Sequence, residues 1–458
     1  MGEFKLDKIN QDGKLKNDDY GSPVYAWYVV TILLLAYVTS FLDRTILTLL
    51  VEPIRESLNI TDLQLSLLHG FAFAVFYVSL GIPIARYADS HNRVKLISAG
   101  VLVWSTMTAI CGLARNFTHM FLARIGVGIG EATLSPAAYS LISDYFPVEK
   151  RPLAYSVYQT GIYVGMGLAM IIGGYVIASV PAIDMPFYGP MEPWQVVFLL
   201  VGLPGLIVFL LLRTIKEPAR KDMMVDDDGN TSVSFKEVLS FINARRVAYG
   251  SVIGGVAAKS LAFYGVSAWL PTYFIRTFGW DAQTIGLWYG LASIVFGVIG
   301  INSGSRVSLW IRERGYTDAN LRICMGAEAC LIPIGIAASL MPTPELSLSF
   351  YCGFIFFAAF SVGCQAAALQ EITPNQMRAQ VSAIYLFVTN MVGIGFGPTF
   401  IAFFTDVIFK SDAMVGYSMS ISVAFACPIG VFLFWYGLKP YRKCLALAKE
   451  NFADPNLS

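Results

Sequence analysis

Four ionisable residues interrupt long apolar stretches in the first third of the chain. Asp43 and Arg44 are adjacent in one stretch, and Arg124 and Glu131 lie seven residues apart in another. An α-helix has 3.6 residues per turn, so this spacing predicts that Arg124 and Glu131 share one face, two turns apart. Gly128 lies between them on that face and leaves room for a partner.

Two carboxylates and two guanidiniums in one place can hold an anion and move a proton. Arg44 and Arg124 are candidates for binding an anionic head group such as a phosphate. Asp43 and Glu131 are candidates for proton coupling, because desolvation favours the protonated form of a carboxyl group and a nearby guanidinium favours the ionised form. A change of partner would therefore load or release a proton.

The alternative is a static salt-bridge network that only holds two helices together. An Asp, Lys or Arg at the centre of a membrane helix costs at least about 2.5–3.5 kcal/mol, and buried ion pairs are weak evidence of net stability. A functional role is therefore favoured. Lys259 is a further candidate for substrate binding, because it lies deep inside its apolar stretch. Glu328 is expected near the membrane interface, and His69 near a solvated helix end.

The composition predicts what surrounds these charges. Of the 458 residues, 56% are hydrophobic and 14% are charged, whereas a soluble domain carries about 25% charged residues. Most of the surface is therefore expected to face lipid. A net charge of +1 without a basic block argues against a nucleic-acid partner. The seven cysteines lack paired spacing, so neither a disulfide framework nor a metal site is expected.

Twelve apolar stretches are long enough to cross a bilayer, which takes about 20 residues each. They cover approximately residues 26–50, 63–88, 94–114, 118–144, 152–180, 195–212, 248–275, 282–308, 321–341, 346–370, 379–409 and 413–438. With a cytoplasmic N-terminus, most of the 32 Lys and Arg fall in cytoplasmic segments, as the positive-inside rule requires. The prediction is an all-α integral membrane protein of twelve transmembrane helices with both termini in the cytoplasm.

The two halves of the chain look duplicated. Pro147 and Arg151 follow the fourth stretch, and Pro374 and Arg378 follow the tenth, at a common offset of 227 residues. Parallel six-helix repeats are typical of facilitator-type transporters. The predicted division is a cytoplasmic tail (1–24), a first six-helix half (25–212), a cytoplasmic linker (213–247), a second six-helix half (248–438) and a cytoplasmic C-terminal tail (439–458).

The same offset also compares the charges of the two halves. The positions equivalent to the four charged residues of the first half are uncharged, namely Leu270, Pro271, Tyr351 and Ala358. The second half is therefore expected to contribute mostly apolar surface. At the end of the linker, Ser234, Glu237 and the apolar residues Phe235, Val238, Leu239 and Ile242 predict a capped amphipathic helix on the inner membrane surface.

The loop after the second stretch resembles the signature of the major facilitator superfamily, Gly-x-x-x-Asp-Arg-x-Gly-Arg-Arg/Lys. It reads Ala85-Arg-Tyr-Ala-Asp89-Ser-His-Asn-Arg93-Val-Lys95, in which Asp89 and Arg93 match and Ala85, Ser90 and Asn92 differ. The resemblance implies the major facilitator fold, with this loop latching a cytoplasmic gate. Asp89, Arg93, Arg151 and Arg378 are the gate residues that it suggests.

Within that superfamily the first half resembles bacterial Spinster homologues. The similar stretches are Phe41-Leu-Asp43-Arg44, Val51-Glu-Pro-Ile-Arg-Glu-Ser-Leu, Leu67-Leu-His-Gly-Phe-Ala-Phe-Ala and Gly126-Val-Gly-Ile-Gly-Glu131-Ala. The resemblance implies proton-coupled movement of a lysophospholipid or sphingosine phosphate. The Asp-Arg pair also resembles that of organic-anion:proton symporters, so transport of a sugar acid is the alternative.

The expected function is secondary active transport by alternating access in a bacterial inner membrane. The expected partners are a small amphipathic or anionic substrate and the lipid bilayer, with the monomer as the functional unit. No cofactor is expected, and a proton gradient would supply the driving force. A receptor without transport ranks lower because no signalling domain is recognised. An enzyme is not expected because no nucleophile or metal cluster has the required spacing.

Overall fold

The computed structural model describes residues 22–147, 150–185, 189–220, 235–374 and 377–453. The first half of the chain is built from helices and one short hairpin. They are α1 (Pro23–Leu49), α2 (Val51–Leu58), α3 (Asp62–Ser66), the π-helical turn η3 (Leu67–Phe71), α4 (Ala72–Ser90), α5 (Arg93–Cys111), α6 (Phe117–Glu131), α7 (Leu134–Tyr145), α8 (Arg151–Ser179), β1 (Ile183–Met185), β2 (Gly189–Met191) and α9 (Pro193–Leu212).

The second half is again helical and contains two π-helical segments. Its elements are α10 (Phe235–Ala244), α11 (Arg246–Phe278), α12 (Ala282–Glu313), α13 (Ala319–Ala338), α14 (Pro344–Phe360), α15 (Val362–Glu371), α16 (Arg378–Asn390), π-helical η5 (Met391–Phe396), α17 (Gly397–Phe403), π-helical η6 (Phe404–Phe409), η7 (Asp412–Met414) and α18 (Val415–Ala453). A helix begins within about three residues of the predicted start of each apolar stretch. The antiparallel hairpin β1–β2 was not predicted.

Local sequence explains where several helices begin. Pro23 and Pro193 occupy the first turn of α1 and α9, where the missing N–H is no loss. Thr61 and Gln64 form a capping box at α3. Asp281 caps α12 by accepting a hydrogen bond of 2.6 Å from the Thr284 N–H. That bond lowers the pKa of the Asp281 carboxyl.

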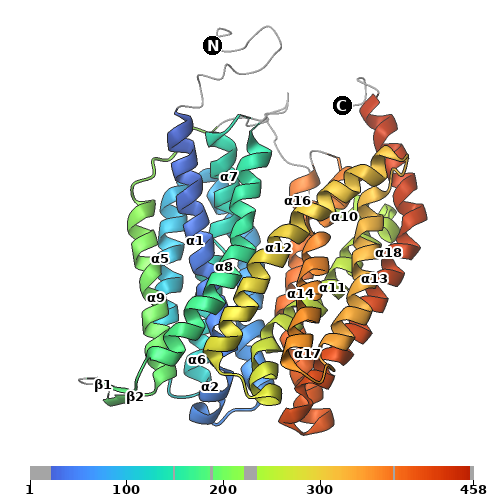
Figure 1. Cartoon of the computed structure of the whole chain (residues 1–458). Coiled ribbons are helices and arrows are strands. Elements are labelled where there is room, and N and C mark those ends of the chain that lie inside the picture. The colour runs from blue at the N-terminus through green and yellow to red at the C-terminus, as the bar shows by residue number, and fades with distance from the viewer. Residues whose placement is uncertain (1–21, 148–149, 186–188, 221–234, 375–376, 454–458) are drawn as a thin grey trace.

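Figure 1 shows the two halves as two groups of long helices standing side by side. The start of α1 and the end of α18 lie at the same end of the bundle, which we call the proximal end. The hairpin and α2 lie at the opposite end, which we call the distal end. The sequence prediction makes the proximal end cytoplasmic.

Among the described residues, eleven helices are long and apolar enough to cross a membrane. The predicted stretch at 118–144 is not among them, because it is divided into α6 and α7 on either side of Ala132 and Thr133. The equivalent helix of the second half is likewise divided, into α14 and α15 at Ser361. The fold is therefore an all-α membrane fold, and the count of twelve stays a prediction.

The two halves share one apolar core at the distal end of the bundle but have separate apolar cores at the proximal end. Three clusters of buried residues occur in the described part of the chain. One cluster at the distal end includes residues of both halves, such as Leu47 and Ile54 with Trp269 and Phe274. At the proximal end, most of one cluster belongs to the first half and another to the second. The halves are thus joined distally and have separate cores proximally.

The repeat is visible in individual hydrogen bonds. Arg151 Nε donates to the carbonyl oxygen of Phe146 at 2.9 Å. Arg378 Nε donates to the carbonyl oxygen of Thr373 at 3.2 Å. Both residues of the second pair are displaced from the first by the 227-residue offset. The two loops therefore share one local structure.

The amphipathic linker helix is present as α10. Val238 is buried in the proximal core of the second half, and Phe241 and Ile242 pack against that core. Phe235 and Leu239 are exposed, as expected of a helix that also touches lipid. Its proposed cap, Ser234, lies outside the described residues. The last helix continues beyond 438, so α18 includes most of the predicted tail.

Labelling of single cysteines tests the predicted orientation. Asp184 and Glu345 are exposed at the distal end, whereas position 226 belongs to the linker. We expect cysteine at 184 or 345 to react with an impermeant thiol reagent in intact cells, and cysteine at 226 to react only after permeabilisation. The reverse pattern would overturn the assignment of both termini to the cytoplasm.

Candidate functional site

The charged residues of α1 and α6 form one cluster inside the first half. Arg44 of α1 and Glu131 of α6 form an ion pair through Nη2 and Oε2. The Glu131 side chain is 1% exposed and that of Arg44 is 13% exposed. Arg44 is thus the accessible member of a pair that is otherwise buried. The predicted meeting of these helices at their charges is observed.

Arg124 binds backbone oxygens of two neighbouring helices. Its Nη1 donates to the Asp43 carbonyl oxygen at 3.2 Å, and its Nε donates to the Leu68 carbonyl oxygen at 3.3 Å. Leu68 belongs to the π-helical turn η3. Such turns are often found at functional sites. Arg124 is fully buried, so it joins α1, η3 and α6.

Phe73 of α4 lies close to both guanidinium groups. Its ring centre lies 4.4 Å from the Arg44 guanidinium carbon and 5.9 Å from that of Arg124. Contact with a ring face stabilises a cation. The close approach depends on Gly128, because a Cβ there would collide with the Phe73 carbonyl oxygen. The room predicted beside Gly128 is therefore filled by Phe73, which the sequence did not identify.

Several polar atoms of this cluster have no hydrogen-bond partner among the described residues. They are Asp43 Oδ1, Arg44 Nε, Arg124 Nη2 and Glu131 Oε1. Trp104 Nε1 and Thr108 Oγ1 of α5 are donors within reach of the Asp43 carboxyl, but they do not meet the full geometry of a hydrogen bond. Each unsatisfied buried group costs about 1–3 kcal/mol. A network that only clamped helices would satisfy its members, so these groups fit a site that changes partners.

His69 also belongs to this region, contrary to the expectation of a solvated helix end. It lies in the π-helical turn η3 and is partly buried. It interacts electrostatically with Arg124 and Arg44. The only sequence signal was its position one residue from Leu68, within an apolar run.

Lys259 lies apart from this cluster. Its Nζ donates to the Ala358 carbonyl oxygen at 3.0 Å and to Ser361 Oγ at 3.4 Å. It also interacts electrostatically with Glu328, which is 0% exposed in the middle of α13. The interfacial placement expected for Glu328 is therefore wrong, and the second half is not simply apolar.

The predicted gate residues lie at the proximal end. Arg93 is fully buried and forms ion pairs with Asp144 of α7 at 2.5 Å and with Glu217 at 2.7 Å. It thereby ties α5 and α7 to the segment after α9. Asp89 is in the last turn of α4, and its side chain lies outside the described part. Arg151 and Arg378 make the equivalent backbone contacts given above.

Among the described residues, three ion pairs join the two halves at the distal end, and the sequence analysis did not predict them. Arg276 of α11 binds Glu52 at 2.5 Å and Asp62 at 2.6 Å. Arg55 binds Asp412 of the second half at 2.5 Å, and also Asp62 of its own half at 3.0 Å. The hydrogen bond with Asp412 raises the pKa of Arg55. We call these five residues the distal latch.

Two hydrogen bonds extend the contact between the halves toward the centre. The Leu63 N–H donates to Asp406 Oδ2 at 2.7 Å, and Ser66 Oγ donates to Thr399 Oγ1 at 3.3 Å. Asp62, Asp406 and Asp412 bring carboxylate oxygens within 4.8 Å of one another. Because Arg55 and Arg276 pair with two of the three, this cluster is part of an ion-pair network.

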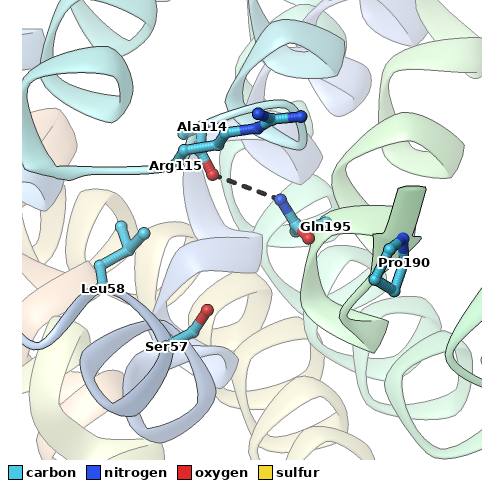
Figure 2. Close-up of a pocket in the computed structure, with 6 residues that line it drawn as sticks. All are labelled: Ser57, Leu58, Ala114, Arg115, Pro190 and Gln195. Atoms are coloured by element: carbon cyan, nitrogen blue, oxygen red, sulfur yellow. Dashed lines mark hydrogen bonds between the residues drawn. The ribbon is translucent and has the colours of Figure 1, made fainter. Parts of the chain in front are cut away.

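A pocket of about 360 Å³ opens at the distal end of the first half. Figure 2 shows its lining, in which Gln195 Nε2 donates to the Ala114 carbonyl oxygen at 3.3 Å. Its lining residues are Ser57, Leu58, Ala114, Arg115, Pro190 and Gln195. None of the buried charges of α1 and α6 lines it, so we do not assign it to the candidate site.

Comparisons with known proteins agree with this architecture. Residues 33–398 match the model of the Major Facilitator Superfamily. The structure resembles the crystal structure of a bacterial homologue of the human lysosomal transporter Spinster in an inward-facing and unoccupied conformation. The TM-score is 0.73 and the identity is 26%, covering 95% of this chain and 100% of that one.

Similar proteins of known name are transporters of different kinds. An MFS-type efflux pump of Mycolicibacterium smegmatis is 25% identical over 430 residues, covering 93% of this chain and 95% of that protein. A probable L-galactonate transporter of Escherichia coli is 24% identical over 82% of each chain. A sphingosine-1-phosphate transporter of Mus musculus is 25% identical, covering 88% of this chain and 74% of that protein.

Proposed function

Because the chain belongs to the Major Facilitator Superfamily, we propose that it moves an amphipathic anionic lipid across the membrane by proton-coupled alternating access. The lipid would be of the lysophospholipid or sphingosine-phosphate type. The observation that carries the proposal is the buried cluster of Asp43, Arg44, Arg124 and Glu131, which combines anion-binding and proton-carrying groups with unsatisfied polar atoms.

Alternating access requires a bundle that opens at one end while it closes at the other. The shared distal core and the distal latch close one end, and the proximal cores of the two halves are separate. With the predicted orientation, this is an inward-facing conformation. Opening of the distal end would require the latch to break and the proximal gate at Asp89, Arg93, Arg151 and Arg378 to form.

Proton coupling is assigned to Glu131 and Asp43. In the present conformation Glu131 binds Arg44, which is the more accessible member of the pair. An anionic head group that binds Arg44 competes with Glu131 for the same guanidinium. The Glu131 carboxyl then loses its cation while it stays buried, and the protonated form is favoured. Substrate and proton would thereby be taken up together at one site.

The lipid substrate is supported by the similarity to Spinster and to a sphingosine-1-phosphate transporter. Rings of Phe41, Phe73 and Tyr77 surround the Arg44 guanidinium, and such a setting suits a phosphate joined to an apolar chain. The second candidate is a sugar acid, which is favoured by the similarity to a probable L-galactonate transporter. A carboxylate would bind the same arginine.

Thermal unfolding of the purified protein in detergent separates these candidates. A ligand that binds only the folded state raises the unfolding temperature, with about 2.7 kcal/mol of added stability at a concentration of 100 Kd. We expect sphingosine phosphate or a lysophospholipid to raise it and galactonate to leave it unchanged. The Arg44→Ala variant should lose the shift, whereas Arg322→Ala, which removes an arginine far from the cluster, should keep it.

A shift with galactonate alone would favour the sugar-acid alternative. A shift that is equal in wild type and Arg44→Ala would mean that the lipid acts on the bilayer-facing surface, and would overturn the assignment of the site. Neutral detergents of the same chain length control for that surface effect.

A further inference from the structure

The second half contains a buried acid and base whose place corresponds to the charged cluster of the first half. Lys259 donates to the carbonyl oxygen of Ala358, and Ala358 is the position equivalent to Glu131 at the 227-residue offset. Both Glu131 and Ala358 lie within three residues of the point where their helix is divided. The two halves thus hold charge at equivalent depths, although the residues that carry it differ.

The division between α14 and α15 explains why a lysine is held there. The last carbonyl groups of a helix have no partner within the helix, and a cation near them is stabilised. Lys259 Nζ lies 3.0 Å from the Ala358 carbonyl oxygen and 3.4 Å from Ser361 Oγ. Gln365 Nε2 donates to the same Ser361 oxygen at 2.8 Å. The lysine is 6% exposed and is therefore nearly sealed from solvent.

Glu328 faces this lysine without touching it. Both carboxyl oxygens of Glu328 lack a hydrogen bond to the described residues. The titratable groups that interact electrostatically with Glu328 are Lys259 of α11, Cys324 one turn away on α13, and Cys427 of α18. Gly430 of α18 lies directly against the carboxyl, where a Cβ would collide with it. An ionised carboxylate so placed would be stripped of water and of donors, at a cost of several kcal/mol.

We propose that Glu328 is a second proton-binding site, with Lys259 as the partner that decides whether the proton stays. In the present conformation Lys259 is held by Ala358 and Ser361, and Glu328 carries the proton. When the second half changes conformation and Lys259 turns to Glu328, the O–H bond of the acid breaks, the proton leaves to water and an ion pair forms. The proton-to-substrate ratio then depends on both halves.

Infrared spectroscopy of the purified full-length protein tests this without any substrate. A protonated carboxylic acid has a carbonyl stretch that a carboxylate lacks, and its frequency falls in deuterium oxide. We expect such a band at neutral pH in wild type, its loss in Glu328→Gln, and its persistence in Glu131→Gln and in the exposed control Glu345→Gln. The Lys259→Met variant should keep the band to higher pH than wild type, because no cation remains to stabilise the ionised form.

A band that is unchanged in Glu328→Gln would overturn the proposal, as would equal pH dependence in wild type and Lys259→Met. The use of Glu328 in transport rests on the proposed proton coupling, but the infrared result does not. If transport does not respond to a pH gradient while the Glu328 band is present, Glu328 binds a proton but takes no part in transport. If transport responds to the pH gradient while the Glu328 band is absent, only the proposal for Glu328 is rejected and the proposed function stands.

Discussion

Transport by the Glu131→Gln variant is expected to lose its response to a pH gradient while substrate binding is retained. One pH unit supplies about 1.4 kcal/mol for each coupled proton, which supports about a tenfold concentration ratio of substrate. Removing Glu131 as a carrier would remove the tenfold factor that its proton supplies. Glutamine keeps the shape of Glu131 and a hydrogen bond to Arg44, so the anion site should remain. Liposomes with an imposed pH gradient, normalised for folded protein, give the measurement.

Three further variants locate the effect within the cluster. Asp43→Asn should lose the response instead of Glu131→Gln if Asp43 is the carrier, and Arg44→Ala or Arg124→Ala should lose binding at every pH. A static network predicts lower thermal stability in all four variants with a normal response to the gradient. A normal response in both acid variants would falsify the coupling role. Glu345→Gln, at an exposed position, is the matched control.

The Arg276→Gln variant is expected to open the distal end of the bundle. Arg276 is 8% exposed and binds Asp62, whose side chain is fully buried, as well as Glu52. Removing one partner of a buried charge pair at an interface costs about 2–5 kcal/mol. That loss applies only to the distally closed conformation, so the balance should shift toward the open one by roughly 30-fold or more.

Cross-linking between the halves measures this shift. Ser66 and Thr399 have hydroxyl oxygens 3.3 Å apart across the interface, so cysteines at both positions should form a disulfide when the distal end is closed. The rate should fall in Arg276→Gln and stay normal in Arg322→Gln, which removes an ion pair within the second half at the proximal end. An unchanged rate in Arg276→Gln would show that the latch does not hold the closed state.

The membrane helices and the repeat could be predicted from the sequence because their signals are local. Apolar runs and turn residues mark the helices, and the 227-residue offset is carried by single prolines and arginines that the structure confirms. The meeting of the two helices at their charges was expected because ionisable residues inside membrane helices usually pair with one another, although the sequence did not specify that Arg44 pairs with Glu131. These inferences use only local residue patterns.

The contacts that the sequence did not reveal depend on which helices are neighbours. The latch residue Arg276 binds partners 214 and 224 positions away, and Arg55 binds one 357 positions away. No short pattern encodes such pairs. Arg124 donates to the Leu68 carbonyl oxygen and Lys259 donates to that of Ala358, and the availability of these two acceptors depends on a widened or divided helix and not on residue type.

The widened turn at 67–71 also affects how the chain tolerates changes in length. A π-helical turn bonds residue i to i+5 and so contains one residue more than the α-helical turn that would replace it. A natural relative with one residue fewer in this turn would keep Asp62 and Phe73 on nearly their present faces. A deletion elsewhere in the helix would rotate one end against the other by about 100°. We therefore expect relatives to differ in length by one residue at this turn. A shorter relative would lose the hydrogen bond that Arg124 makes to the Leu68 carbonyl oxygen.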